Sequence, residues 1–302
     1  MNRKINNKTT STRGFAHLYG FKSHFLNLNS HLLHYIDEGK GRPVLMVHGN
    51  PTWSFYFRRL IKDLSSEYRT IVPDHIGCGF SDKPCTDEYD YTLETRVHDL
   101  DVLIKSLDLK EKLTMIVHDW GGMIGSAWAL QNSDKIDRIV VTNTAGFFMP
   151  DKKQFPLRLW LIKYVKPFAI PAVLGLNLFS ECAVFMAAAT HLEKDVKKGL
   201  TAPYNSWKNR IATLKFVQDI PLSPNDPSYD LVSYVDENLY QLNPIPMMIL
   251  WGEKDFVFDI SFLNEWKKRF PHARVHLFHD AGHYLFEDKP KATSLLVKNF
   301  LK

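Results

Sequence analysis

Short apolar runs alternate with longer helical patterns along most of this chain. The runs "PVLMVHG", "YRTIVPD", "LTMIVHD" and "IDRIVVTNTA" are largely apolar, and segments with helical periodicity separate them. Strands that are apolar on both faces belong in a parallel sheet that helices cover on both sides. The alternation therefore predicts an α/β protein with a mostly parallel sheet and helices on both faces.

Two stretches depart from this alternation. The stretch "HFLNLNSHLLHYIDEGKG" alternates apolar and polar residues around Asn29 and Ser30, which predicts an antiparallel hairpin before the first parallel strand. After about Gly146 the chain is helix-like and punctuated by prolines until "PIPMMILWGEKD" and "ARVHLFHDAGH" resume the strand pattern. We expect a helical insertion after the fourth parallel strand, over the carboxyl edge of the sheet. The predicted division is a flexible arm at 1–14, a core at 15–146 and 227–302, and a helical cap at 147–226.

The composition favours a globular protein of a reducing compartment. The chain has 302 residues, of which 45% are apolar, and it has no run of 18 uncharged apolar residues. Its opening "MNRKINNKTTSTRG" lacks the apolar stretch of a signal peptide, so a soluble cytoplasmic protein is expected. Cys78, Cys85 and Cys182 are an odd number without metal-ligand spacing, which predicts buried or half-buried thiols and no disulfide.

Positive charge is concentrated in the predicted cap. Residues 151–220 contain 11 Lys and Arg against 5 Asp and Glu, whereas the whole chain has a formal charge of +5. Such a segment could attract an anionic partner, a membrane surface or an acidic substrate. The alternative is an ordinary solvated helix surface. One hypothesis is that the cap docks on an acidic face of a partner enzyme; no nucleic acid partner is expected.

Three strand ends carry ionisable side chains that are candidates for catalysis. Asp119 ends the strand of "VHDWGG", Asp255 follows "MMILWGEK", and His283 follows "VHLFHDAG". Parallel strands bring their carboxyl ends to one edge, so these side chains are expected to meet there. The order nucleophile, acid, base is that of α/β-hydrolases, and the turn at Asp119 resembles a nucleophile elbow in which Asp replaces Ser and Val117 replaces the first glycine.

An aspartate at this turn restricts the reactions that are available. A carboxylate with a pKa of about 4 is already ionised at neutral pH, so it needs no base to become a nucleophile. Attack on a saturated carbon leaves an ester, which water can cleave, whereas serine would leave an ether. Asp119 therefore indicates displacement at an alkyl carbon or opening of a strained ring. His283 would activate water for the second step, and Asp255 would orient His283.

The stretch "VHGNPTWSFYFRRLI" follows the first parallel strand, where this fold places one backbone donor of an oxyanion hole. Trp120, the residue after the nucleophile, supplies the second donor. The side chains of Asn50 and Trp120 add neutral N–H donors that suit a leaving halide or a developing carboxylate. The alternative for Asn50 is a turn with Pro51, and the alternative for Trp53 is a place in the core.

The motifs "HGNPTWS", "HDWGG", "WGEKD" and "AGHYLFED" resemble the haloalkane dehalogenase family of α/β-hydrolases over nearly the whole chain after residue 15. The resemblance implies Asp119 as nucleophile, His283 as base, Asp255 as acid, and Asn50 with Trp120 as the halide-binding pair. One branch of the family places its acid after the preceding strand. Here that position falls in "VVTNTAGFF", which contains no acid, so Asp255 is the candidate.

Further stretches narrow the resemblance. "VPDHIGCGFSDKP", "YDYTLETRVHDL", "NRIATLKFVQDIPLSP" and "KDFVFDISFL" are similar to the β-lactone decarboxylases of bacterial long-chain olefin biosynthesis. This resemblance implies conversion of a cis-3,4-dialkyl-β-lactone into a cis-olefin and carbon dioxide, with Asn50 and Trp120 on the lactone oxygens. It also implies a hydrophobic small-molecule substrate and other enzymes of an olefin-forming assembly as partners. Membrane association is compatible with the sequence but not required.

Three other functions are compatible with parts of this sequence. Haloalkane dehalogenation is the main alternative. Epoxide hydrolysis would need two cap tyrosines, for which Tyr164 and Tyr204 are candidates, and a non-catalytic binding protein would not need the Asp119, His283 and Asp255 set. No metal, nucleotide or flavin cofactor is expected, because the chain has no phosphate-binding glycine loop and no ligand-spaced His or Cys cluster.

Overall fold

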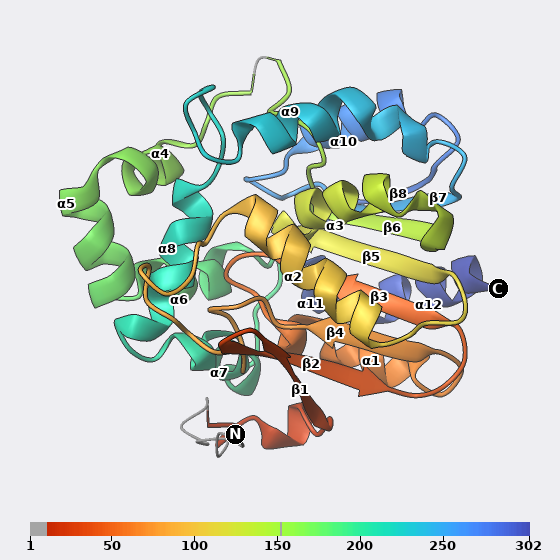
Figure 1. Ribbon diagram of the computed structural model, residues 1–302, viewed down its shortest axis with the longest axis horizontal. Coiled ribbons are helices and arrows are strands. Elements are labelled where there is room, and N and C mark those ends of the chain that lie inside the picture. The colour runs from red at the N-terminus through yellow and green to blue at the C-terminus, as the bar shows by residue number, and fades with distance from the viewer. Residues whose placement is uncertain (1–10, 152) are drawn as a thin grey trace.

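The computed structural model describes residues 11–151 and 153–302, and these contain one eight-stranded sheet. The strand order is β1-β2-β4-β3-β5-β6-β7-β8 (Figure 1). The strands are β1 (Ser23–Leu28), β2 (His31–Glu38), β3 (Pro43–Val47), β4 (Arg69–Pro73), β5 (Leu113–Asp119), β6 (Ile136–Thr144), β7 (Met247–Gly252) and β8 (Arg274–Phe278). Only the pairings of β1 with β2 and of β2 with β4 are antiparallel, so the predicted mostly parallel sheet is confirmed.

The predicted hairpin at the start of the chain is also confirmed. Leu28 pairs with His31 across the turn, and Asn29 has a φ of 55°. This left-handed conformation is one that asparagine adopts more readily than most residues. The hairpin adds two antiparallel strands at the β4 edge and leaves the centre of the sheet to the apolar parallel strands.

The sheet has a separate hydrophobic core on each face. Alternate residues of β3 point to opposite sides: Leu45 and Val47 pack into one core, and Val44 and Met46 into the other. The first core lies under α2 (Leu93–Ser106), α3 (Trp120–Gln131) and α10 (Ile260–Arg269), and the second lies under α1 (Arg58–Leu64) and α12 (Pro290–Leu301). Burial on both faces explains why these strands are apolar throughout.

The order of the strands determines where a ligand can reach them. From β3 the chain moves outward to β4, and it then returns to β5 on the other side of β3. Open α/β sheets bind ligands at the carboxyl ends of the strands where the order reverses in this way. This point lies between the ends of β3 and β5, next to Gly49 and Asp119.

Between β6 and β7 the described residues form helices and no strand. In Figure 1 most of these helices form a separate layer beside one end of the sheet. They are α4 (Leu157–Tyr164), α5 (Lys166–Ala169), a π-helical turn (Ile170–Gly175), α6 (Leu178–Met186), α7 (Lys194–Thr201), α8 (Ile211–Gln218) and α9 (Tyr229–Asn238). α4, the π-helical turn and α8 share a small core that includes Ile162, Val173 and Leu214. The boundaries 147 and 226 of the predicted cap stay a prediction, and we call residues 147–226 the cap segment.

The remaining elements are short. They are the 3-10 helices Ala16–Leu18, Ser54–Phe57, Ser133–Lys135, Ala202–Tyr204, Lys208–Arg210 and Leu239–Leu242, and the helix α11 (Leu285–Asp288). Most of the predicted arm at 1–14 lies outside the described residues. Among the described residues no single helix is long and apolar enough to cross a membrane; Lys166–Gly175 and Leu178–Met186 meet that criterion only as a pair bent by 73°.

The cysteine prediction is correct in part. All three cysteines are free, Cys78 is buried and Cys85 is half-buried. The prediction is wrong for Cys182, which is exposed because it lies on the outer side of α6.

Candidate active site

Asp119 lies at the sharp turn from β5 into α3. Its backbone has φ 52° and ψ −128°, a strained conformation for a residue with a side chain. Gly121 and Gly122 make the turn possible, because a Cβ at either position would collide with the β3 backbone or with Thr144. The turn therefore has the strand-to-helix geometry of a nucleophile elbow and presents the Asp119 side chain at the carboxyl edge of the sheet.

The Asp119 carboxylate is held by backbone donors on one side and faces a histidine on the other. Oδ1 accepts a hydrogen bond of 2.5 Å from the Asn50 N–H, and Oδ2 lies 3.6 Å from Nε2 of His283. Burial raises the pKa of Asp119, while His283 and the N–H groups of Asn50 and Trp120 act against this increase. Oδ2 is thus the oxygen that is free to attack a substrate.

The two backbone donors contact the Asp119 carboxylate itself. The N–H groups of Asn50 and Trp120, which form an oxyanion hole in serine enzymes of this fold, both stabilise the Asp119 carboxylate. If Oδ2 forms an ester, Oδ1 becomes its carbonyl oxygen and is already in the oxyanion position. The Asn50 N–H on Oδ1 then stabilises the charge that develops there when the ester is attacked.

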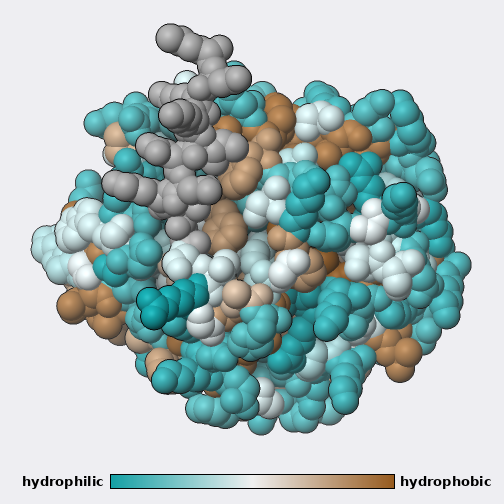
Figure 2. Space-filling model, turned by 90° about the horizontal axis from the view of Figure 1, so that it is seen from below, coloured by the Kyte–Doolittle hydropathy of each residue, from teal (hydrophilic) through white to brown (hydrophobic). Residues whose placement is uncertain are grey.

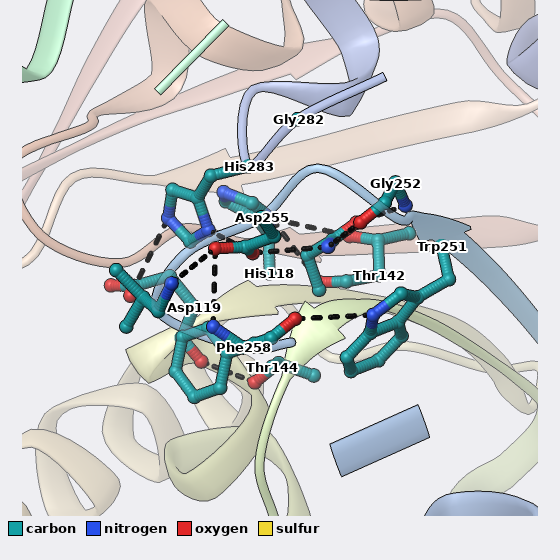
Figure 3. A network of polar contacts seen from close by, with 12 residues as sticks. His118, Asp119, Thr142, Thr144, Trp251, Gly252, Asp255, Phe258, Gly282 and His283 are labelled. Carbon is teal, nitrogen blue, oxygen red and sulfur yellow. Dashed lines mark hydrogen bonds and ion pairs between the residues drawn. The ribbon is translucent and has the colours of Figure 1, made fainter. Parts of the chain in front are cut away.

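His283 and Asp255 form the rest of a triad (Figure 3). Nδ1 of His283 lies 2.7 Å from Oδ2 of Asp255, whose Oδ1 accepts hydrogen bonds from the N–H groups of Val257 and Phe258. Burial lowers the pKa of His283, but Asp255 and Asp119 more than offset it, so the pKa is raised. An Nδ1–H donated to Asp255 leaves Nε2 of the neutral ring directed towards Asp119. The structure therefore brings together the three residues that the strand ends indicated; their catalytic roles stay a prediction.

Asn50 and Trp120 lie beside Asp119, as expected, but the Asn50 side chain has an additional partner. Its Nδ2 donates a hydrogen bond of 3.0 Å to the carbonyl of Thr213 on α8. The Trp120 ring is half-buried against Phe216 of the same helix, with 5.4 Å between ring centroids. One Asn50 N–H is thus used to hold the cap segment, which leaves the second for a ligand. The sequence gives no indication of this contact, because it joins residues 163 positions apart.

Asn143 is a site residue that the sequence did not indicate. It adopts a φ of 35°, donates from Nδ2 to Oδ2 of Asp255 at 3.0 Å, and accepts from the Gly252 N–H. It lies in "VVTNTAGFF", a stretch that contains no acid but has this asparagine at the end of a strand. Asn143 therefore fixes the carboxylate that in turn fixes His283.

Replacing Asn143 with alanine is expected to lower kcat about tenfold, because Asp255 loses a donor and His283 loses its fixed orientation. The loss should disappear when Asp255 is already asparagine, since both changes act through the same contact. Rates of the single and double variants measure this. Asn205→Ala, at an exposed asparagine, is the control, and an undiminished loss in the double variant would argue against positioning through Asp255.

Gly49 provides a second test of the site geometry. A Cβ at this position would occupy the space of the Asp119 carboxyl group. We expect Gly49→Ala to displace the nucleophile and to lower kcat/KM about 100-fold, because small misplacements of reacting groups are costly. Gly20→Ala is the control, since a Cβ there meets no atom within 4 Å. Equal rates for the two variants would show that Asp119 does not need this position.

A buried cation lies behind Trp120. Arg96 of α2 is 1% exposed, and its Cζ lies 3.5 Å from the centroid of the Phe216 ring, which packs on Trp120. None of its three guanidinium nitrogens has a hydrogen-bond partner among the described residues. A positive charge one ring behind Trp120 favours the development of negative charge at this end of the site.

The tyrosine pair of an epoxide hydrolase is not formed by the two candidates. The buried Tyr204 hydroxyl donates to the carbonyl of Thr52, and Tyr164 is 47% exposed on α4 with its ring against Trp160. Neither hydroxyl contacts Asp119 in the part of the chain that the structure describes. Within those same residues, no group of three or more His, Cys, Asp or Glu side chains could hold a metal ion.

Comparisons with known proteins agree with this fold. A family model described as the alpha/beta hydrolase fold matches residues 42–290. The chain is similar to a cis-3-alkyl-4-alkyloxetan-2-one decarboxylase of Shewanella oneidensis, with 48% identity over 94% of this chain and 89% of the relative. The relative of that name in Xanthomonas campestris pv. campestris is 41% identical over 89% of this chain and 91% of its own.

Dehalogenases are also similar, at lower identity. Haloalkane dehalogenase 2 of Mycobacterium tuberculosis is 29% identical over 94% of this chain and 96% of its own. Among solved structures, a loop variant of a haloalkane dehalogenase from Bradyrhizobium elkanii superposes with a TM-score of 0.82 at 22% identity, over 93% of this chain and 96% of that one. At 22% identity, the similarity to that structure shows a shared fold and nothing further.

Proposed function

This chain belongs to the α/β-hydrolase fold family, and on that premise we propose that it is a β-lactone decarboxylase. An oxetan-2-one is a β-lactone, and the proposed reaction converts a cis-3,4-dialkyl-β-lactone into a cis-olefin and carbon dioxide. The observation that carries the proposal is the identity of 48% and 41% with two relatives of that name over nearly the whole chain. The dehalogenase relative is 29% identical over a similar length.

The geometry at Asp119 suits opening of the lactone ring. In the proposed first step Oδ2 attacks the saturated ring carbon next to the ring oxygen, the bond between this carbon and the ring oxygen breaks, and the ring oxygen becomes part of a carboxylate. The product of this step is an alkyl ester of Asp119. The remaining N–H of Asn50 and the indole N–H of Trp120 would bind the new carboxylate, and the positive charge of Arg96 behind Trp120 favours it.

The second step would release both products. The electron pair of the bond to the carboxylate carbon forms the olefin, carbon dioxide leaves, and the bond to Oδ2 breaks to return the Asp119 carboxylate. Inversion at the attacked carbon followed by anti elimination converts a cis-lactone into a cis-olefin. The route consumes no water, since the olefin and carbon dioxide contain every atom of the lactone. His283, 3.6 Å from the returning carboxylate, favours its departure when protonated.

Haloalkane dehalogenation is the second candidate, because the dehalogenase relative matches along 94% of this chain. In that reaction Asp119 would displace a halide held by Asn50 and Trp120. His283 would then activate a water molecule to hydrolyse the ester, with Asp255 stabilising the imidazolium. The two reactions share a nucleophile and differ in whether water is consumed.

A comparison of two substrates tests the proposal. The purified protein is given a long-chain cis-β-lactone in one tube and a brominated alkane of medium length in another, and olefin and bromide are measured. We expect olefin from the lactone and no bromide. Bromide without olefin would contradict the proposed decarboxylase activity and favour haloalkane dehalogenation.

The partners of the enzyme and its cellular compartment are part of the same proposal. A dialkyl lactone is a hydrophobic small molecule, so we propose that other enzymes of an olefin-forming assembly supply it in the cytoplasm. Support comes from the names of the two decarboxylase relatives, which describe a dialkyl-substituted lactone.

A further inference from the structure

Large apolar side chains are exposed mainly on the cap segment. Fifteen large hydrophobic residues are exposed in the part of the chain that the structure describes, and ten of them lie between Leu157 and Trp207. That stretch is about a sixth of the chain. Leu157, Leu176 and Phe185 are the most exposed, at 68–69%. Apolar groups gathered in this way on a surface mark an interaction site.

Nine of these ten side chains lie in the continuous helical stretch 157–186, and Trp207 lies next to Gly175 of the π-helical turn. Nη1 of Arg158 on α4 lies 3.3 Å from the sulfur of Met186 on α6, and Nζ of Lys197 on α7 lies 4.4 Å from the ring of Phe185. In Figure 2, which keeps these helices at the left as in Figure 1, apolar side chains reach the surface at that end. We call the exposed side of α4, α5, the π-helical turn and α6 the cap face.

The charges around the cap face are mostly positive. Arg158 and Lys166 are exposed on it beside the exposed Glu181, while α7 and its N-cap add Lys194, Lys197 and Lys198 against Glu193 and Asp195. Lys163 does not contribute, because it is buried in an ion pair with Asp226. The cap face thus combines aliphatic, tryptophan and tyrosine side chains with cations, which is the composition of a segment that lies at the surface of an anionic membrane.

We propose that the cap face docks on the surface of a lipid bilayer that contains anionic lipids. The helices Lys166–Gly175 and Leu178–Met186 are strongly apolar, but each is short and they meet at 73°, which suits a position in the interface. Cationic side chains reach the phosphates while Leu157, Leu176 and Phe185 enter the acyl region. Under the proposed function, an apolar substrate and an olefin product would then exchange directly with the bilayer, but docking itself does not depend on that function.

Flotation with lipid vesicles tests the docking. The whole protein is mixed with phosphatidylcholine vesicles that contain or lack phosphatidylglycerol, at low and high salt. We expect binding to the vesicles with phosphatidylglycerol, weakened by salt, and at least a tenfold loss of affinity in Leu157→Ser/Phe185→Ser, because both side chains lose apolar burial. The matched control is Tyr240→Ser/Leu295→Ser, which changes two residues that are 63% and 60% exposed outside the cap segment.

Several outcomes would overturn the proposal. The first is that the unaltered protein does not bind anionic vesicles. The second is that the two double variants lose equal vesicle affinity. The third is that the protein self-associates without binding vesicles, and that the cap variant abolishes this self-association. Lactone turnover in detergent is measured alongside on all proteins. Turnover without vesicle binding rejects the docking alone, whereas vesicle binding without turnover rejects the proposed function alone.

Discussion

Asp119→Asn is expected to lower turnover by a factor of about 10⁴ or more. Asparagine has the shape of aspartate and can still accept the hydrogen bond from the Asn50 N–H. It has no negatively charged oxygen to attack carbon, so the ring or the carbon–halogen bond stays intact. The measurement is the initial rate of olefin or bromide release by the purified variant.

Asp280→Asn is the control for this change. Asp280 is an exposed aspartate that pairs with Lys289, so its variant should retain the full rate. A normal rate in Asp119→Asn, with the thermal transition unchanged, would remove Asp119 as the nucleophile. It would favour a protein that uses the fold to bind a ligand without attacking it.

A buried ion pair gives the largest expected change in stability. Arg58 and Glu287 are 2% and 1% exposed, and they form a two-point contact in which Nη2 lies 2.9 Å from Oε2. Arg58 is on α1 and Glu287 is on α11, four positions after His283. Arg58→Met should lower the free energy of unfolding by about 3–5 kcal/mol, because Glu287 stays buried without its partner.

Urea denaturation measures this loss. The control is Lys110→Met, which breaks a pair with Asp108 whose two side chains are both 78% exposed, and no measurable change is expected there. Equal midpoints for the two variants would mean that Glu287 finds another partner or takes up a proton. Glu287→Gln/Arg58→Met, which removes both charges, should recover much of the loss.

The sheet and the ends of its strands were predictable because local periodicity encodes them. The apolar runs that end at Asp119 and Asp255 have to be buried on both faces, and one edge of the sheet then collects their carboxyl ends. The resemblance to dehalogenases and β-lactone decarboxylases was confirmed by the comparisons. The catalytic roles of these residues and the cap boundaries stay predictions.

Other features depend on contacts between distant segments, which no local pattern encodes. The bond from Asn50 to Thr213, the support of Asp255 by Asn143, and the buried Arg96 are of this kind. The role of the charges in the cap segment could not be predicted from the sequence either. The segment's count of lysines and arginines was compatible with an anionic partner, a membrane surface or an acidic substrate, and only the structure shows that Lys163 is used internally and that apolar side chains are exposed beside the other cations.

The fate of the lactone carbonyl carbon distinguishes decarboxylation from hydrolysis. A cis-3,4-dialkyl-β-lactone labelled with ¹³C at the carbonyl is turned over by the purified protein, and gas and organic phases are analysed by mass spectrometry. We expect the label to leave as carbon dioxide in equal amount to the cis-olefin. Label retained in a β-hydroxy acid, without olefin, would contradict the decarboxylase and show that water opens the ring.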